Sequence, residues 1–204
     1  MNARIAGLSL LVAALALPAA PATAQLGQSA GYKFLQAIRD SKNDEVIATL
    51  SKPGSSIVNT RDFNTGESAI HIVTKRGDIP YLNYLIANQA DPNLRDNKGE
   101  TAMLIAAGNG RTDILEILKK AGANVNLANN SGETPLIRAV QHRDMATVRT
   151  LLAEGADPDQ GDVIAGMSAR DYAHQDTRSP AIAKLIDETP KKAKLAVSGP
   201  KLTR

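Results

Sequence analysis

Apolar residues along the chain fall in short runs that recur at a fixed spacing and are separated by polar, glycine-containing stretches. In the segment RTDILEILKKAG, Ile114, Leu115 and Leu118 share one face of a predicted helix. The preceding segment, TAMLIAAGNG, predicts a shorter helix with small alanines. Three similar segments, GESAIHIVTKRG, GETAMLIAAGNG and GETPLIRAVQHR, begin at equal intervals along the chain, so the pattern predicts a repeated pair of helices.

Several columns of residues keep this period. The glycine column is Gly66, Gly99, Gly132 and Gly166, in which the spacing stays constant to within one position. Two residues later come Ser68, Thr101, Thr134 and Ser168, and an Asn or Asp recurs at Asn59, Asn93, Asn126 and Asp159. A Ser or Thr oxygen at a helix start accepts a hydrogen bond from a free backbone N–H, so the second column predicts helix caps. Gly122 is predicted to end the second helix of its unit in the left-handed conformation.

These motifs resemble the ankyrin-repeat family, whose signature is Gly-x-Thr-Pro-Leu-His-x-Ala, two helices and then Gly-Ala-Asp-x-Asn. The matches are GETPLIRA, GETAMLIA and GESAIHIV, with closing motifs GANVN, GADPD and QADPN. The resemblance implies an all-α ankyrin-repeat solenoid of about five helix-turn-helix units with short turns or hairpins. The repeat domain is expected at residues 32–189, with units at about 32–62, 63–95, 96–128, 129–162 and 163–189.

Three places depart from the signature in an informative way. Only His71 fills the family's histidine place, where it is expected to form a structural hydrogen bond at the start of its helix. Residues 32–62 lack the Ser/Thr-Pro start, which favours an N-terminal capping unit. In the last unit Arg170 and Asp171 replace apolar residues, and a terminal repeat is expected to carry such residues on a polar outer face.

Residues 1–24 have the pattern of a secretory signal peptide. Arg4 is followed by an apolar run at residues 5–17, which is shorter than the roughly 20 residues that span a bilayer. Small residues then stand where a signal peptidase requires them. The predicted cleavage site comprises Ala22, Ala24 and Gln25. An N-terminal membrane anchor is the alternative interpretation, and the main prediction leaves no stable membrane anchoring after cleavage.

Charge differs between the body and the end of the chain. Of the 24 basic residues, six lie outside residues 25–189, which leaves 18 there against 21 acidic residues. The body is therefore mildly acidic although the whole chain carries +3, and it lacks the basic excess that nucleic-acid partners require. Residues 25–31 are predicted to be a linker, and residues 190–204 a flexible basic tail. A loose contact of the tail with anionic lipid or an acidic partner is the alternative.

The sequence offers no convincing group of catalytic or metal-binding residues. His71, His142 and His174 each stand at a different distance after the glycine of their repeat, so their convergence on a metal is not expected. The chain has no cysteine, and the motifs of common hydrolases and phosphate-binding loops are missing. We therefore expect neither an enzyme nor a cofactor. The alternative is a small-ligand or metal-handling periplasmic protein that uses the groove or His142 and His174.

The ankyrin resemblance implies that another protein binds the concave groove of turn tips and first helices. The family's variable contact places correspond to Thr65, Glu67, Lys75, Arg76, Asn97, Lys98, Glu100, Asn109, Asn130, Ser131, Glu133, Gln141 and His142. These side chains are polar and of mixed sign, without an aromatic anchor, and Arg76 is the strongest candidate among them. The sequence therefore predicts a monomeric, non-enzymatic scaffold, protector or inhibitor of a partner protein, exported to the periplasm or, alternatively, secreted.

Overall fold

The computed structural model describes residues 29–52 and 56–190 of the 204-residue chain. The predicted signal peptide and its cleavage site lie outside the described residues, as do most of the linker and all of the tail beyond Pro190. These assignments stay predictions. No helix among the described residues is long and apolar enough to cross a membrane.

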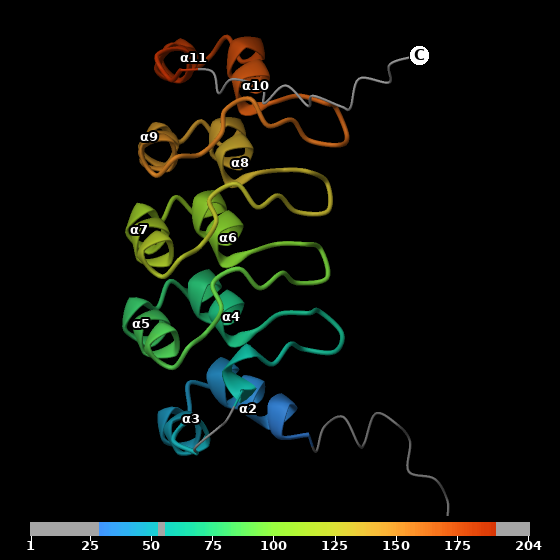
Figure 1. Ribbon diagram of the computed structural model, residues 1–204, viewed down its shortest axis with the longest axis vertical. Coiled ribbons are helices and arrows are strands. Elements are labelled where there is room, and N and C mark those ends of the chain that lie inside the picture. The colour runs from blue at the N-terminus through green and yellow to red at the C-terminus, as the bar shows by residue number, and fades with distance from the viewer. Residues whose placement is uncertain (1–28, 53–55, 191–204) are drawn as a thin grey trace, which may run out of the picture.

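Within the described residues the chain forms five pairs of α-helices and one short 3₁₀-helix (Figure 1). The first helices of the pairs are α2 (Ala30–Arg39), α4 (Ala69–Arg76), α6 (Ala102–Gly108), α8 (Pro135–Gln141) and α10 (Ala169–Gln175). The second helices are α3 (Asn43–Leu50), α5 (Ile79–Ala87), α7 (Thr112–Lys120), α9 (Met145–Ala153) and α11 (Pro180–Asp187), and η1 (Ile57–Asn59) follows α3.

The pairs stack along the long axis of the molecule. In Figure 1, α4, α6, α8 and α10 stand in one column and α5, α7, α9 and α11 in another, while hairpin loops project beside the first column. The only β-structure among the described residues is a pair of isolated antiparallel bridges, Arg61 with Ser68 and Gly161 with Ser168. The predicted all-α solenoid of five helix-turn-helix units is therefore confirmed.

The predicted helix caps are present. Thr101 Oγ1 accepts a hydrogen bond from the backbone N–H of Leu104 at 3.2 Å, and Thr134 Oγ1 does the same for Ile137. Ser29 caps α2 in the same way, so this helix begins at Ala30, two residues before the expected start of the repeat domain. Each such cap contributes about 1 kcal/mol because it satisfies a backbone donor that the helix cannot.

The core is built from Leu, Ile, Val and Ala side chains that run through all five pairs. Ala106 and Ala107 of α6 are buried, and their small side chains let neighbouring first helices pack closely. Leu115 and Leu118 of α7 are also buried, on the face that the spacing of apolar residues predicted. Burying a side chain of that size contributes roughly 1.5–3 kcal/mol, so the stacking of units supplies most of the stability.

The Asn column joins successive units through the backbone. The Nδ2 group of Asn93 donates to Gly122 O at 3.2 Å, and its Oδ1 accepts from the backbone N–H of Asn124 at 2.8 Å. Asn126 repeats both bonds with Gly155 and Asp157 of the next unit. An amide suits this place because it carries a donor and an acceptor at once.

In the last unit this place holds Asp159, which meets Arg170 instead of a further repeat. The Nε group of Arg170 lies 2.8 Å from Asp159 Oδ1, and its Nη1 group lies 2.9 Å from Ile186 O. Arg170 is only 8% exposed, so the expectation that it lies on a polar outer face is wrong. Its guanidinium is satisfied internally because α11 ends beside it, whereas Asp171 is exposed and forms a capping box with Ser168.

Candidate functional site

Four hairpin loops, at residues 62–66, 96–99, 129–132 and 162–166, project beside the first helices and are called fingers here (Figure 1). Successive fingers are joined by one backbone hydrogen bond each. The N–H groups of Asn97, Asn130 and Val163 donate to the oxygens of Thr65, Lys98 and Ser131, respectively, each over 3.0 Å. The fingers therefore form a continuous ladder rather than four independent loops.

Each finger is held in shape by an Asp or Asn at its base. Asp96 Oδ1 accepts from the backbone N–H groups of Lys98 and Glu100, at 2.8 and 2.9 Å. The other members of this column are Asp62, Asn129 and Asp162. The pKa of Asp62 falls to about 2, chiefly because of a backbone hydrogen bond from Thr65 and a side-chain bond from Arg39. The sequence interpretation missed this column, although its members keep the period of the repeat.

The glycine column is required by the contact between fingers. Gly132 has φ of +77°, a left-handed conformation that favours glycine. A Cβ atom at this place would lie 2.5 Å from the backbone nitrogen of Val163 in the next finger. Gly132 therefore lets the fingers approach closely enough to form the ladder.

The predicted contact residues in the fingers differ in what their side chains do. Thr65, Asn97, Lys98 and Asn130 are exposed, whereas Ser131 is half-buried. Asn97 Nδ2 donates to Asn64 O at 2.8 Å, and Asn130 Nδ2 donates to Asn97 O at 3.0 Å. The two asparagines therefore already hold the ladder together, and Thr65 Oγ1 accepts a hydrogen bond from the backbone N–H of Glu67, which leaves Lys98 as the predicted finger residue most available to a partner.

Ion pairs fix the side chains of Glu100 and Glu133, each of which directly follows a glycine of the repeat. Glu100 Oε2 lies 2.6 Å from Arg138 Nη1, and Arg138 Nη2 also pairs with Glu133. Asn129 Nδ2 donates to both carboxylates. The hydrogen bond from Arg138 lowers the pKa of Glu100 below its usual value. Burial opposes the charge of Arg138, but its hydrogen bonds to Glu100 and Glu133 outweigh burial and raise the pKa of Arg138.

Four of the predicted contact residues line one hollow between α6 and α8, with a volume of about 350 Å³. They are Lys75, Glu100, Asn109 and His142. Arg138 lines it too and was missed, because it stands at a variable place of the motif that holds Ile72 and Ile105 in the two preceding units. Lys75 Nζ pairs with Glu67, which is also a predicted contact residue. This ion pair holds Glu67 beside the hollow. The charges here are paired and fixed, which suits a polar contact with a partner.

Arg76, the expected anchor of the interface, makes its contacts within the chain. Its Nη1 group donates to Ile38 O and Ser41 Oγ, both at 3.0 Å, and its Nη2 group pairs with Asp78. The guanidinium carbon also lies 5.4 Å from the centre of the Tyr81 ring. The bonds to Ile38 and Ser41 join the first two units, and both terminal nitrogens of Arg76 are engaged within the chain.

Three apolar side chains at the two end fingers are strongly exposed. Phe63 is 76% exposed, and Val163 and Ile164 are 73% and 79% exposed. Phe63 is therefore an exposed aromatic side chain next to the predicted contact residues, which themselves include no aromatic residue. The signal was available in the sequence, because an apolar residue inside a turn cannot belong to a helical core face.

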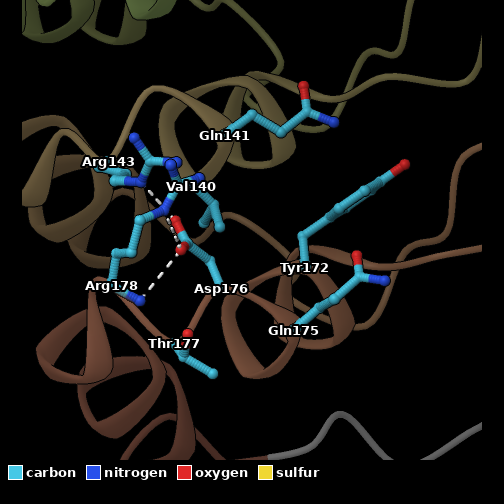
Figure 2. A pocket seen from close by; sticks show the side chains of 8 residues that line it. All are labelled: Val140, Gln141, Arg143, Tyr172, Gln175, Asp176, Thr177 and Arg178. Atoms are coloured by element: carbon cyan, nitrogen blue, oxygen red, sulfur yellow. Dashed lines mark hydrogen bonds and ion pairs between the residues drawn. The ribbon is translucent and has the colours of Figure 1, made fainter.

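A second hollow, of about 400 Å³, lies between the ends of α8 and α10 and is lined by the predicted residue Gln141 (Figure 2). The structure gives the histidines different surroundings. His71 is buried and bonded to Ser68, as expected, while His174 Nε2 lies 3.0 Å from Asp187 Oδ1. His142 lines the first hollow. Within the described part of the chain, no group of three or more His, Cys, Asp or Glu side chains could hold a metal ion.

Comparison with known proteins agrees with this arrangement. A family model described as "Ankyrin repeats (3 copies)" matches residues 34–126 and residues 70–162. No match is found among curated proteins. The matched residues run from α2 into the last finger and include three complete helical pairs and the start of the ladder. On the repeat columns, the helical pairs and this match, the chain belongs to the ankyrin-repeat family.

Proposed function

We propose that this protein is exported and binds a partner protein through its fingers and first helices, acting as a scaffold, protector or inhibitor in the periplasm. Ankyrin repeats are protein–protein interaction modules, and they are generally non-enzymatic. The observation that carries the proposal is the exposure of Phe63, Val163 and Ile164 on fingers that the backbone ladder holds in place. Large apolar side chains in water on an ordered surface gain free energy when a partner covers them.

The polar residues between the two apolar ends are suited to specificity. Glu100 and Arg138 border the hollow between α6 and α8, where their ion pair orients both side chains, and Lys98 is exposed on the second finger. Polar groups that are already oriented cost less conformational entropy on binding. A partner would therefore be anchored at the end fingers and selected by the polar middle.

Site-specific photo-crosslinking in cells tests this proposal. We expect Phe63→p-benzoylphenylalanine to capture one defined protein, and Phe63→Ser with Ile164→Ser to abolish its co-purification. The control site is Glu116, which is exposed on α7, in the column of helices away from the fingers. Capture of the same protein from Glu116 at equal yield would contradict binding through the fingers.

Export is tested separately. It rests on the charged start, short apolar run and small residues of the first 24 positions. The mature protein is expected in a periplasmic fraction, with Gln25 as its first residue by N-terminal sequencing. Recovery in the culture medium would favour the secreted alternative, and an uncleaved chain in the membrane fraction would contradict both.

The small-ligand alternative has less support. His142 and His174 are both exposed, but they have different neighbours, and His174 is already paired with Asp187. Calorimetric titration with divalent metals decides it. A saturable heat signal that His142→Ala removes would revive the alternative.

A further inference from the structure

The hollow between α8 and α10 contains two arginines held by one carboxylate (Figure 2). Arg143 follows α8, whereas Asp176 and Arg178 follow α10. The Nε group of Arg143 pairs with Asp176 Oδ2, and the Nε group of Arg178 lies 3.0 Å from Asp176 Oδ1. Asp176 Oδ1 also accepts the backbone N–H of Arg178 at 3.1 Å. Asp176 therefore orients both guanidinium groups.

Both guanidinium groups keep donors that the fold does not use. A guanidinium has five N–H groups, and each of these arginines uses only the one at Nε within the described residues. The side chains of Arg143 and Arg178 are 39% and 72% exposed, so their terminal nitrogens are accessible. Two arginines and one aspartate leave a local charge of +1, which matches a ligand with a single negative charge.

The backbone of Arg143 gives a second, independent argument. Arg143 has φ of +57°, and the equivalent places in the two preceding units are Gly77 and Gly110, with φ of +73° and +66°. A side chain in this conformation costs roughly 1 kcal/mol relative to glycine. The ion pair between Arg143 and Asp176 is half-exposed, so it stabilises the fold by no more than about 1 kcal/mol. The fold would therefore be served equally well by glycine, and strain of this kind is characteristic of functional positions.

The first unit shows the same rule. Ser41 has φ of +56° at the equivalent place, and its hydroxyl accepts a hydrogen bond from Arg76 of the next unit. Where this place is not glycine, the side chain therefore contacts a residue of another unit. Arg143 meets this rule through its Nε group, which pairs with Asp176 of the last unit, and its terminal nitrogens remain without a partner among the described residues.

We propose that this hollow binds a carboxylate group of the partner protein, held by the terminal nitrogens of Arg143 and Arg178. The planar fork of a guanidinium matches a carboxylate in two parallel hydrogen bonds. The ring of Tyr172 and the amides of Gln141 and Gln175 line the same hollow. They would contact the partner's residue whose carboxylate binds the two arginines. The identification of the ligand's source as a protein rests on the proposed function, whereas carboxylate binding itself does not.

The direct test is titration of the full chain with short peptides, followed by NMR of the arginine Nε–Hε signals. The probe is acetyl-Gly-Glu-Gly-amide, and acetyl-Gly-Gln-Gly-amide is its neutral match. A third peptide, acetyl-Gly-Gly-Gly with a free carboxyl terminus, distinguishes a chain end from a side chain. We expect saturable shifts of the Arg143 and Arg178 signals with one or both carboxylate peptides and none with the neutral peptide. Equal shifts with all three peptides would overturn the proposal, as would saturation by inorganic phosphate alone.

The variant Arg143→Gly separates binding from folding. It is expected to bind the carboxylate peptide about tenfold more weakly, because charge-assisted hydrogen bonds are lost. Its thermal midpoint should be unchanged or higher, because the left-handed strain is relieved. Gln89→Gly is the matched control, since Gln89 has φ of +65° after α5 and does not line the hollow. Arg178→Gln removes the second guanidinium from an exposed place and should weaken binding without affecting folding.

The outcomes distinguish this inference from the proposed function. If Arg143→Gly binds the carboxylate peptides as the unchanged chain does, the carboxylate site is wrong, whatever the finger variants do. If the peptides bind as expected but Phe63 captures no protein, the carboxylate site stands and the proposed function fails.

Discussion

The Nε2 atom of the buried His71 lies 3.0 Å from the main-chain oxygen of Glu100 in the next unit. On the other side of the ring, Nδ1 lies 3.1 Å from the backbone nitrogen of Ser68 and accepts its hydrogen. The proton of the neutral ring therefore sits on Nε2, from which it is donated to Glu100. One imidazole both caps α4 and joins two units, and burial is the main reason why the pKa of His71 is lowered.

This arrangement predicts that stability depends on pH near neutrality. The pKa of His71 is lower in the folded chain than its ordinary value of 6.5, so the unfolded chain binds more protons between the two values. The contribution is complete above pH 6.5 and is lost as the pH falls from there through the folded pKa. Urea unfolding between about pH 5 and 8 should show the free energy of unfolding decreasing on the acid side.

The variant His71→Leu should remove most of this dependence. Leu104 and Ile137 occupy the same place in the next two units, so the variant should fold with a loss of about 1 kcal/mol at pH 8. His174→Leu is the control, because His174 is exposed. A pH slope that persists in His71→Leu but disappears in His174→Leu would contradict the assignment.

The asparagine column predicts a graded loss of stability. Asn93→Ala removes the bond to Gly122 and the bond from Asn124, at a cost of about 2 kcal/mol in unfolding free energy. Asn93→Asp keeps the acceptor for Asn124 but places a carboxylate oxygen, which cannot donate, against Gly122 O, so it should be no more stable than Asn93→Ala. Asn83→Ala, on the exposed side of α5, should change stability by less than about 0.5 kcal/mol. An aspartate variant as stable as the unchanged chain would contradict this account.

At the C-terminal end, Arg170 should tolerate an apolar replacement better than truncation. Its partners Asp159 and Asp187 have side chains 33% and 47% exposed, so water can hydrate them when the arginine is gone. Arg170→Met places a methionine where the third unit has the buried Met103, so packing should be kept. We expect a cost of about 1 kcal/mol in unfolding free energy. Arg170→Ala leaves a cavity and should cost about 3 kcal/mol. Thermal unfolding measures both, and equal losses would mean that the ion pairs rather than packing stabilise this end.

Features that repeat could be predicted from the sequence, and features that occur once could not. The glycines, the Ser/Thr caps and the asparagines each occupy a column, so the same physical cause is visible several times. The five helical pairs and the role of Gly122 follow from glycines, caps and asparagines that recur, whereas the role of His71 follows from the resemblance to the ankyrin signature, and both roles are confirmed.

Arg170 shows what the columns could not reveal. Its charge predicted an exposed face, but the end of α11 supplies acceptors that the repeat columns do not indicate, Ile186 O and Asp187 Oδ1. Phe63 and Arg138 also stand at variable places of the repeat. The exposure of Phe63 and the bond from Arg138 to Glu100 depend on neighbours that are distant in the sequence. The predicted contact residues are mostly brought to one face, but which of them are already engaged depends on hydrogen bonds between units.

The Arg138 network gives a prediction in which the sign of the pH dependence reverses. In the unchanged chain the pKa of Glu100 is lowered, so its contribution to stability is lost as the pH falls below 4.5. Arg138→Met removes the shared cation and leaves the carboxylates of Glu100 and Glu133 beside each other. Like charges at close range raise a carboxyl pKa, so acid should now relieve the repulsion. The side chains of Arg138 and its two partners are only 15–21% exposed, and we expect a loss of about 2 kcal/mol at pH 7.

The measurement is urea unfolding of Arg138→Met at pH 7 and pH 4, compared with the unchanged chain at the same pH values. The difference in unfolding free energy should shrink at pH 4, because one of the two carboxyl groups can then bind a proton. Adding Glu100→Gln to Arg138→Met should recover part of the loss at pH 7, since it removes one of the two charges. A loss that is the same at both pH values and is not recovered in the double variant would assign the role of Arg138 to packing against Gly108, whose added Cβ would lie 2.9 Å from the arginine Cδ.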